Sequence, residues 1–448
     1  MARVYPFRAL RYNPSLVRLE DVVTQPYDKI TPAMQQAYYQ RSPYNLVRII
    51  LGLPELFDGE AGSDIYARAA RDFSDWRKNG VLSQESEPCI FAYSQRFAVP
   101  GKPGKVHERR GLIALGELHD YEDKVVFRHE QTLAKPKSDR LNLLRATRAH
   151  FGQIFMLYSD PGLSVDQLLF DSSKGPASAA PDIEVTDEFE VTHRVWRVSD
   201  ANIINLVTTA LEDKKMIIAD GHHRYETALN YAKEHAPQKT VASERRSQSI
   251  PQPAYPEAAM MMTFVNMDAE GLFILPGHRI VHSLTNFSTE DLLERAKAFF
   301  EVQPLSGSES SDLLAELNAV KEGMAFVCVT AAGSFLLTLR AGAAAEVLAG
   351  YSHRQQQLHV VVLHAVVLER LLGLTPESIR NQANLEYLRD AGEAIEKVQT
   401  KEADVAFLIN AVTLDKLREM AFAGETMPQK STDFYPKVLS GLTIYALD

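Results

Sequence analysis

The stretch "MIIADGHHRYETALNYAKEH", residues 216–235, indicates how this part of the chain folds. "MIIA" is an apolar run of strand length, and Tyr225 and Ala228 then recur at the spacing of one helix face. Asp220 and Gly221 fall between the two elements. A strand that turns directly into a helix points the N–H groups of the first helical turn, and the positive end of the helix dipole, at one place. Such a place favours an anion.

The side chains at this turn suit a ligand that carries negative charge. Gly221 lets the backbone approach closely, and His222, His223 and Arg224 add donors within the first turn. Cations here oppose the helix dipole at a cost of about 0.3–1 kcal/mol each, which an anionic ligand would offset. The alternative is that Asp220 is an ordinary N-cap and that both histidines are solvated or hydrogen-bonded locally. Zinc is not favoured, because adjacent histidines point to different sides of a helix and no HExxH pattern occurs.

Strand-like and helix-like stretches alternate along the sequence, which predicts an α+β fold with mixed sheets and flanking helices. Residues 237–257 are rich in Pro, Gln and Ser and read as an exposed loop or linker. They would separate an α/β region over 1–236 from an α+β region over 258–448, unless the second region is intertwined with the first. The individual elements expected are a buried strand over 45–52, a helix over 63–80, a hairpin over 89–118, a helix and then a strand over 128–158, a helix over 201–212, a strand over 258–267 and a buried helix over 358–374.

Composition and charge argue against several classes of function. The 448 residues carry a net charge of −10 from 48 basic and 58 acidic residues, interspersed along the chain, so duplex nucleic acid is not an expected partner. Cys89 and Cys328 have no neighbouring Cys or His pattern, which argues against a disulfide framework or structural zinc and suits the cytoplasm. Neither a signal peptide nor a membrane span is expected, because no apolar run is long enough. A homodimer is left open.

Two further polar segments are candidates for a site. "RHEQTLAKPKSDR" (128–140) has Leu133 as its one large apolar residue. It is either a solvated loop or a site loop whose basic side chains contact phosphate or carboxylate and whose Glu130 acts as base or metal ligand. "VTQPYDKIT" places Asp28 in a Pro-containing loop, either beside a helix cap or as a catalytic carboxylate.

The segment "GETMPQKST" (424–432) nearly spells a P-loop. Gln429 replaces the second glycine, and an apolar helix is expected before it where a P-loop has a strand, so we reject a P-loop. Lys430 and Lys437 nevertheless surround hydroxyl side chains, and two lysines there would attract an anionic substrate unless the segment is an ordinary surface turn.

"ADGHHRYETAL" resembles the G-x-H-R loop of the ParB/sulfiredoxin superfamily, in the D-G-H-H-R form of archaeal free serine kinases. The resemblance implies a strand–loop–helix element that holds nucleotide phosphates. In those kinases the base is a glutamate upstream of this loop, and spacing does not decide between Asp28 and Glu130. A second G-H-R, in "ILPGHRIV" (274–281), leads into an alternating pattern and not into a helix, so the first copy is favoured.

The whole chain also resembles an uncharacterised family, domain of unknown function 1015. The likeness covers nearly all 448 residues and implies no established chemistry. It is carried by "YPFRAL", "QPYD", "YNLVRIILG", "RHEQT", "PKSDRLNLLRATRA", "ADGHHRYETAL" and "MPQKSTDFYPK".

These observations lead to the hypothesis of a nucleotide-dependent phosphotransferase that uses ATP or ADP with Mg²⁺ and acts on a small hydroxyl metabolite, with free serine or a similar amino acid as the best single guess. Phosphoryl transfer requires mainly positioning and charge stabilisation. The expected residues are Glu130, Asp28 and Asp220 for catalysis; Gly221, His222, His223 and Arg224 for the nucleotide; Asp220 and Glu226 for magnesium; and Arg128, His129, Thr132, Lys137, Arg140, Lys430, Ser431 and Thr432 for the substrate. Its rivals are a non-catalytic nucleotide switch of ParB type and a phosphatase or other hydrolase that uses the same anion pocket.

Overall fold

The computed structural model describes residues 1–53, 64–130, 134–237 and 250–448, and the chain folds into two compact units. Unit 1 comprises Met1–Arg128, Thr132–Leu272 and Pro436–Asp448, and unit 2 comprises His129–Gln131 and Phe273–Tyr435. The division therefore follows residue 272, whereas the sequence suggested 237–257, of which 238–249 lie outside the described residues.

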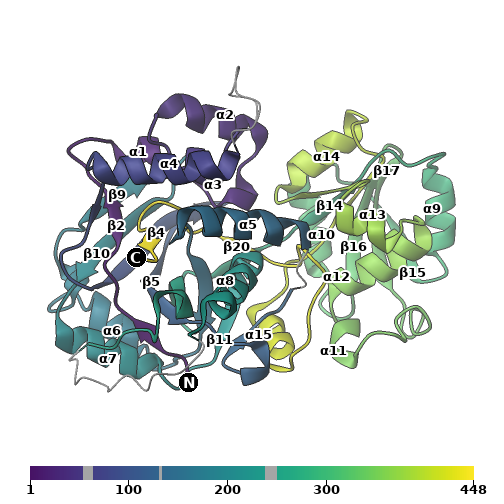
Figure 1. Ribbon diagram of the computed structural model, residues 1–448. Helices are drawn as coiled ribbons and strands as arrows, with labels where there is room; N and C mark the ends of the chain where they lie inside the picture. Colours follow the sequence, from purple (N-terminus) through teal and green to yellow (C-terminus); the bar gives the residue numbers. More distant parts are fainter. Residues whose placement is uncertain (54–63, 131–133, 238–249) are drawn as a thin grey trace. The chain divides into compact units, whose positions relative to one another are not determined.

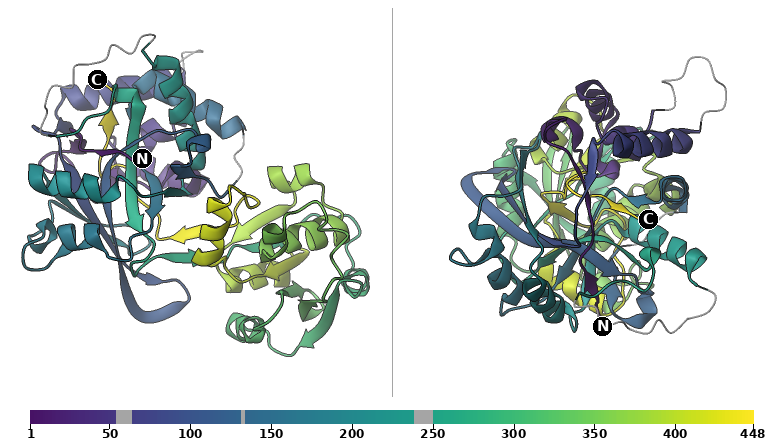
Figure 2. Two further views of the ribbon diagram at one scale, coloured as in Figure 1. Left: turned by 90° about the horizontal axis from the view of Figure 1, so that it is seen from below. Right: turned by 60° about the vertical axis from the view of Figure 1, so that its left-hand side comes forward.

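Unit 1 is built on a mixed sheet (Figure 1). Its strand order is β6 (Val126–Phe127), β11 (Met216–Asp220), β8 (Ile154–Tyr158), β12 (Ala259–Asn266), β5 (Lys102–Glu117), β4 (Ile90–Val99), β10 (Thr192–Val198) and β9 (Ile183–Thr186), with β1 (Val4–Tyr5) paired to β5. The pairs β11–β6 and β12–β8 are parallel, and the others are antiparallel. Figure 2 shows the long β4–β5 hairpin, in blue, from two further sides. Two small pairs complete the strands: β2 (Leu10–Tyr12) with β3 (Leu82–Gln84), and β7 (Ala149–His150) with β21 (Tyr445–Ala446).

Two apolar cores of unit 1 include residues from its helices. The helices of this unit are α1 (Leu19–Val22), η1 (Tyr27–Lys29), α2 (Pro32–Arg41), α3 (Val47–Ile50), α4 (Ile65–Lys78), η2 (Tyr121–Asp123), α5 (Ala134–Thr147), α6 (Ser164–Phe170), η3 (Pro176–Ser178), α7 (Ala201–Leu211), α8 (His222–His235) and η4 (Pro256–Ala258). One core joins α6, α7 and α8 to a face of the large sheet. The other gathers α1, α3, α4 and α5 with residues of β2, β3, β7 and β21.

Unit 2 is a second sheet with helices on both faces. Its strand order is β15 (Phe300–Leu305), β17 (Gly333–Leu339), β16 (Ala325–Thr330), β19 (Val405–Leu408), β14 (His278–Val281) and β18 (Leu385–Leu388), and β13 (Phe273–Leu275) pairs separately with β20 (Asp433–Tyr435). Alternate strand residues point to opposite faces: Phe326 and Phe407 pack with α9 (Thr289–Ala296), α12 (His359–Val362) and the π-helix η5 (Leu363–Leu371), whereas Val327 and Leu408 pack with α10 (Ser310–Ala319) and α14 (Ala391–Gln399). The remaining helices are α11 (His353–Gln356), α13 (Pro376–Asn381) and α15 (Leu414–Phe422).

The α+β class predicted from the alternating pattern is confirmed, and the strand predicted over 45–52 is wrong. There, Val47–Ile50 form the single-turn helix α3. The Asn45 side chain accepts a hydrogen bond from the Val47 amide at 3.0 Å and so stabilises a turn. A short apolar run fits a buried helix as well as a strand. Across the described residues, no helix combines the length and the apolar character that crossing a membrane requires.

Candidate functional site

The turn between β11 and α8 depends on a glycine. Gly221 has φ 97°, in the left-handed region that L side chains rarely adopt, and its carbonyl accepts from the Tyr225 amide at 2.9 Å. Tyr225 and Ala228 are buried against the sheet and hold the fourteen-residue helix in place. Glycine has no side chain that could cap the first-turn amides of α8. The positive end of the dipole of this three- to four-turn helix lies at the same place.

Arg224 folds back over the start of its own helix. A Cβ atom on Gly221 would lie 3.0 Å from Nη2 of Arg224, and one on Gly152 would lie 3.0 Å from Nη1. Two glycines therefore leave the space that the guanidinium occupies. There it donates to Oδ2 of Asp220 at 2.9 Å and to the Gln153 carbonyl.

Asp220 is surrounded by cations from three segments of unit 1. Lys437 reaches its Oδ1 at 3.1 Å, Arg224 its Oδ2, and Lys29 adds positive charge nearby. Burial opposes ionisation of this carboxyl, but the three cations outweigh it and hold the pKa of Asp220 well below its usual range. One negative charge thus faces three positive ones beside the positive end of α8.

The predicted "QPYDK" loop lies at the same place. Tyr27 is stacked under Arg140, whose Cζ is 4.2 Å from the ring centroid. Burial, together with the nearby charge of Asp28, raises the pKa of Tyr27 to about 12, although Arg224 and Arg140 act in the opposite direction. Asp28 itself is exposed.

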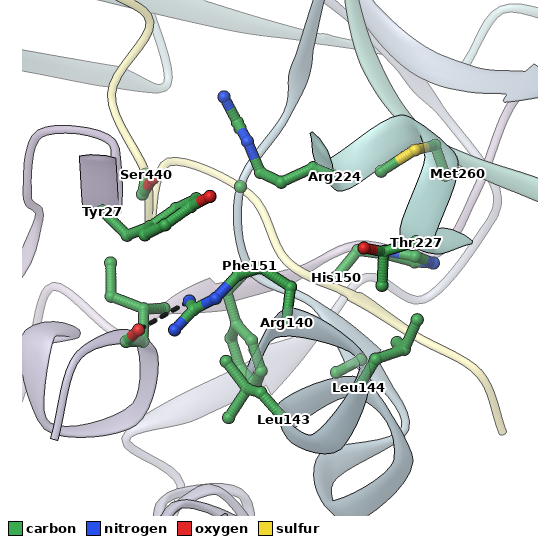
Figure 3. A pocket seen from close by; sticks show the side chains of 13 residues that line it. Tyr27, Arg140, Leu143, Leu144, His150, Phe151, Arg224, Thr227, Met260 and Ser440 are labelled. Atoms are coloured by element: carbon green, nitrogen blue, oxygen red, sulfur yellow. Dashed lines mark hydrogen bonds between the residues drawn. The ribbon is translucent and has the colours of Figure 1, made fainter. Parts of the chain in front are cut away.

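A cavity that is partly open to solvent adjoins these residues. Figure 3 shows Tyr27, Arg140 and Arg224 around this space, with the dashed hydrogen bond from Arg140 to the Ile50 carbonyl, 2.7 Å long. The other residues that line the cavity come from α5, the β7 region, α8, β12 and the C-terminal segment: Leu143, Leu144, Ala149, His150, Phe151, Gly152, Thr227, Met260 and Ser440. Burial lowers the pKa of His150 to about 4, so its imidazole is neutral at pH 7.

The two histidines of the motif and Glu226 stand apart from the cavity lining. His222 is buried and His223 partly exposed, and neither borders the cavity. Glu226, predicted as a magnesium ligand, accepts from Tyr121 at 3.2 Å and pairs through Oε1 with Arg128 at 3.5 Å.

Lys137 pairs with the second oxygen of Glu226. Within the described residues, His, Cys, Asp and Glu side chains form no group of three or more that could hold a metal ion. Each carboxylate oxygen of Asp220 and of Glu226 has a cationic side chain as a partner. This donor set does not fit a magnesium ion held by these two residues.

The predicted residues His129, Glu130, Lys430, Ser431 and Thr432 belong to unit 2. Oε1 of Glu130 accepts from the amides of Ser431 and Thr432 at 3.0 Å each, and from Oγ1 of Thr432 at 3.1 Å. The same hydroxyl contacts Nε2 of His129 at 2.8 Å, and Lys430 is exposed. Here Glu130 organises a loop. Predicted residue Thr132 lies outside the described residues.

Three segments therefore meet in unit 1: the β11–α8 turn, the "QPYDK" loop and the end of "MPQKSTDFYPK". Sequence reasoning did not assign Tyr27, Lys29, His150 or Ser440 to the site, and it placed Lys437 with the substrate instead of opposite Asp220. Lys29 and Tyr27 flank the predicted Asp28, so a signal for them was present. Nothing in the local pattern marks His150.

Fold and site together define a class: an α+β protein of two units, with a cavity bordered by arginines at a strand–helix turn. The model of the family "Protein of unknown function (DUF1015)" matches residues 4–381, so the chain belongs to this family, as the motifs predicted. No curated protein matches the chain.

Several solved structures show a weak likeness. A mutant free serine kinase in complex with AMP is 13% identical, with a TM-score of 0.34, over 70% of this chain and 84% of that chain. A conserved hypothetical protein from Pyrococcus furiosus is 15% identical, with a TM-score of 0.33, over 70% and 89%. C-terminally truncated SbnI from Staphylococcus aureus is 10% identical, with a TM-score of 0.35, over 73% and 85%. Structural similarity at these TM-scores is not evidence for the function of this chain.

Proposed function

We propose that the protein is a nucleotide-dependent phosphotransferase that transfers a phosphoryl group to a small hydroxyl metabolite, with free serine or a similar amino acid as the acceptor. The nucleotide, ATP or ADP, would place its phosphates at the β11–α8 turn and its nucleoside in the adjoining cavity. The motif resemblance to the ParB/sulfiredoxin superfamily gives the same location for the phosphates.

The observation that carries the proposal is the excess of positive charge around Asp220. Arg224, Lys437 and Lys29 place three cations around Asp220, and Asp28 adds a second carboxylate on the turn that carries Lys29, so positive charge remains in excess. A guanidinium has five N–H donors and an ammonium three, so both can hold Asp220 and still donate to phosphate oxygens. The dipole of α8 adds to this attraction.

The cavity suits the nucleoside part of such a ligand. Leu143, Leu144 and Phe151 supply apolar walls, and Arg140 borders the cavity beside Tyr27. His150 is neutral at pH 7 and presents an uncharged aromatic surface.

Asp28 is the carboxylate that we assign as the general base. It is exposed, on the 3₁₀ turn that carries Tyr27, and both oxygens of Asp220 are already paired with cations. Asp28 would take the proton of the acceptor hydroxyl as its oxygen forms a bond to the terminal phosphorus. The bond from that phosphorus to the bridging oxygen breaks, and the shortened nucleotide leaves with the electron pair.

The test incubates the purified protein with ATP or ADP, magnesium chloride and serine, threonine or homoserine, and follows the mixture by ³¹P NMR. We expect a phosphomonoester signal that requires both nucleotide and acceptor. Asp28→Asn should abolish this signal and leave nucleotide affinity unchanged, whereas Asp21→Asn, at the end of α1, is the matched control. Free phosphate without acceptor would support a hydrolase, and binding without any product would support a nucleotide switch.

A further inference from the structure

Lys437 reaches Asp220 from residues 436–440, a segment here called the strap. We propose that the strap is a built-in part of the phosphate site and that Gln95 and Arg109 are positioning residues that fix Lys437 against Asp220. The inference rests on the proposed function, since it assigns these residues to the same anion site.

A row of polar side chains crosses the buried sheet beneath the strap. Gln95 on β4 lies directly opposite Arg109 on β5 and opposite His193 on β10. All three are at most 1% exposed. Polar groups in such a place are costly unless they are hydrogen-bonded, so their bonding partners indicate what they do.

Two of these side chains hold the strap by its backbone. Nε2 of Gln95 donates to the Lys437 carbonyl at 2.7 Å, and Nη2 of Arg109 donates to the Pro436 carbonyl at 2.6 Å. Nε of Arg109 also donates to Oε1 of Gln95 at 3.0 Å, which orients the amide so that its NH₂ group faces the strap. Both carbonyls that flank Lys437 are therefore fixed.

This anchoring contributes directly to the register of Lys437. One residue of extended chain spans about 3.3 Å. A shift of the strap by one residue would therefore carry Nζ of Lys437 out of reach of Asp220, from which it lies 3.1 Å away. The next residues of the strap, Val438 and Leu439, are buried, and the backbone of Leu439 is hydrogen-bonded to Tyr93 of β4.

The same row also ties down the "QPYDK" loop. His193 contacts Tyr93 through Nδ1 at 2.6 Å and Asp187 through Nε2 at 3.2 Å. Asp187 accepts from Gln25 at 3.0 Å, two residues before Tyr27. The strap and this loop pair directly as well, because Thr24 and Ser440 exchange backbone hydrogen bonds of 3.1 and 2.9 Å.

Burying the charged guanidinium of Arg109 costs free energy of desolvation. Burial lowers its pKa to about 10, yet it remains charged at neutral pH, stacked 4.6 Å from the centroid of Phe155. A buried charge is often less stabilising than apolar packing of the same volume. We attribute the buried position of Arg109 under the strap to its role in fixing Lys437 opposite Asp220.

The experiment is a double-mutant cycle on ADP affinity, measured by isothermal titration calorimetry. Gln95→Met keeps the length of the side chain and removes its hydrogen bonds, and Lys437→Met removes the ammonium. We expect a loss of at least tenfold for Lys437→Met, about three- to tenfold for Gln95→Met, and no further loss in the double variant beyond that of Lys437→Met, since Gln95 acts through Lys437. Gln84→Met, on the exposed end of β3, is the matched control.

A second readout does not require a nucleotide. Hydrogen–deuterium exchange of residues 436–440 in the free protein should become faster in Gln95→Met and stay unchanged in Gln84→Met. Gln95→Asn, which keeps an amide but is one methylene shorter, should reproduce both effects and replaces Gln95→Met if that variant does not fold.

Additive losses in the cycle, or unchanged exchange at the strap, would overturn the positioning role. If the wild-type protein binds neither ATP nor ADP while the exchange result is as expected, the proposed function falls and the anchoring of the strap stands.

Discussion

Asp220 and Arg224 illustrate how a few atoms define the site. The carboxylate is paired on both oxygens, so it serves to orient cations and is not available as a base in this arrangement. Arg224 is held by Asp220 on one nitrogen and by the Gln153 carbonyl on the other, which leaves its plane in a fixed orientation at the cavity wall. A preoriented guanidinium loses little freedom when an anion binds.

Replacing Arg224 with alanine should weaken ADP binding by about 10- to 100-fold, or about 1.4 kcal/mol per factor of ten. Charge-assisted hydrogen bonds to phosphate are lost, while Asp220 keeps Lys437 as a partner. The melting temperature should fall by only a few degrees. Calorimetric titration checks affinity, and Arg145→Ala is the control because Arg145 pairs with Glu234 on the surface. A large loss of stability with unchanged affinity would instead assign Arg224 a structural role alone.

His150 should make stability depend on pH below neutrality. Burial lowers its pKa to about 4, whereas an unfolded histidine titrates near 6.5. Between these two values the unfolded state binds the extra proton, so folding stability falls as the pH drops. From pH 7 to pH 5 the wild-type protein should lose about 1–2 kcal/mol more than His150→Gln. Urea denaturation of both proteins at both pH values measures this difference, and equal losses would contradict the buried neutral state.

At the scale of elements, the β11–α8 turn couples backbone geometry to the position of a side chain. Gly221 must adopt φ 97° to end the strand and begin the helix within one residue. The space above it is filled by Arg224 and by Ile154 of β8. Glycine is therefore required at this position for two reasons: the positive φ angle and the absence of space for a Cβ atom.

Gly221→Ala should destabilise the protein by about 2–3 kcal/mol, of which roughly 1–2 kcal/mol is the cost of a left-handed alanine. The rest comes from a Cβ atom placed 2.9 Å from Cδ1 of Ile154 and 3.0 Å from Nη2 of Arg224. Gly80→Ala isolates the first contribution, because Gly80 has φ 72° and no atom within 4 Å of its would-be Cβ. Only Gly221→Ala should also weaken ADP binding, as measured by calorimetry; equal effects of both variants on affinity would contradict the account.

The local pattern predicted elements well where periodicity was long. The strand and helix around Gly221, the β4–β5 hairpin and α7 lie where the apolar spacing placed them. The pattern failed over 45–52, where five apolar residues fit either element and the Asn45 side chain stabilises a turn. It could not place Lys437 opposite Asp220, because that pair is 217 residues apart and depends on the register set by Gln95.

At the scale of the whole molecule, each unit is completed by a segment remote in sequence. His129 and Glu130 belong to unit 2 although the chain before them belongs to unit 1, and Pro436–Asp448 return to unit 1 after unit 2 is complete. The side chains of Glu130 and His129 connect the first of these segments to residues 431 and 432. Folding of either unit therefore requires chain segments that are synthesised far apart.

Glu130 offers a final prediction, because a structural role and a catalytic role give opposite results. Glu130→Ala removes the acceptor of two amides and one hydroxyl and should cost about 1–3 kcal/mol. Hydrogen–deuterium exchange should become faster around residues 427–435 and remain unchanged at α8 in unit 1. Glu130→Gln keeps Oε1 as an acceptor, so it should retain both this protection and phosphoryl transfer, since Asp28 is the proposed base. If Glu130→Gln instead abolishes transfer while exchange stays at the wild-type rate, the base is Glu130 and not Asp28.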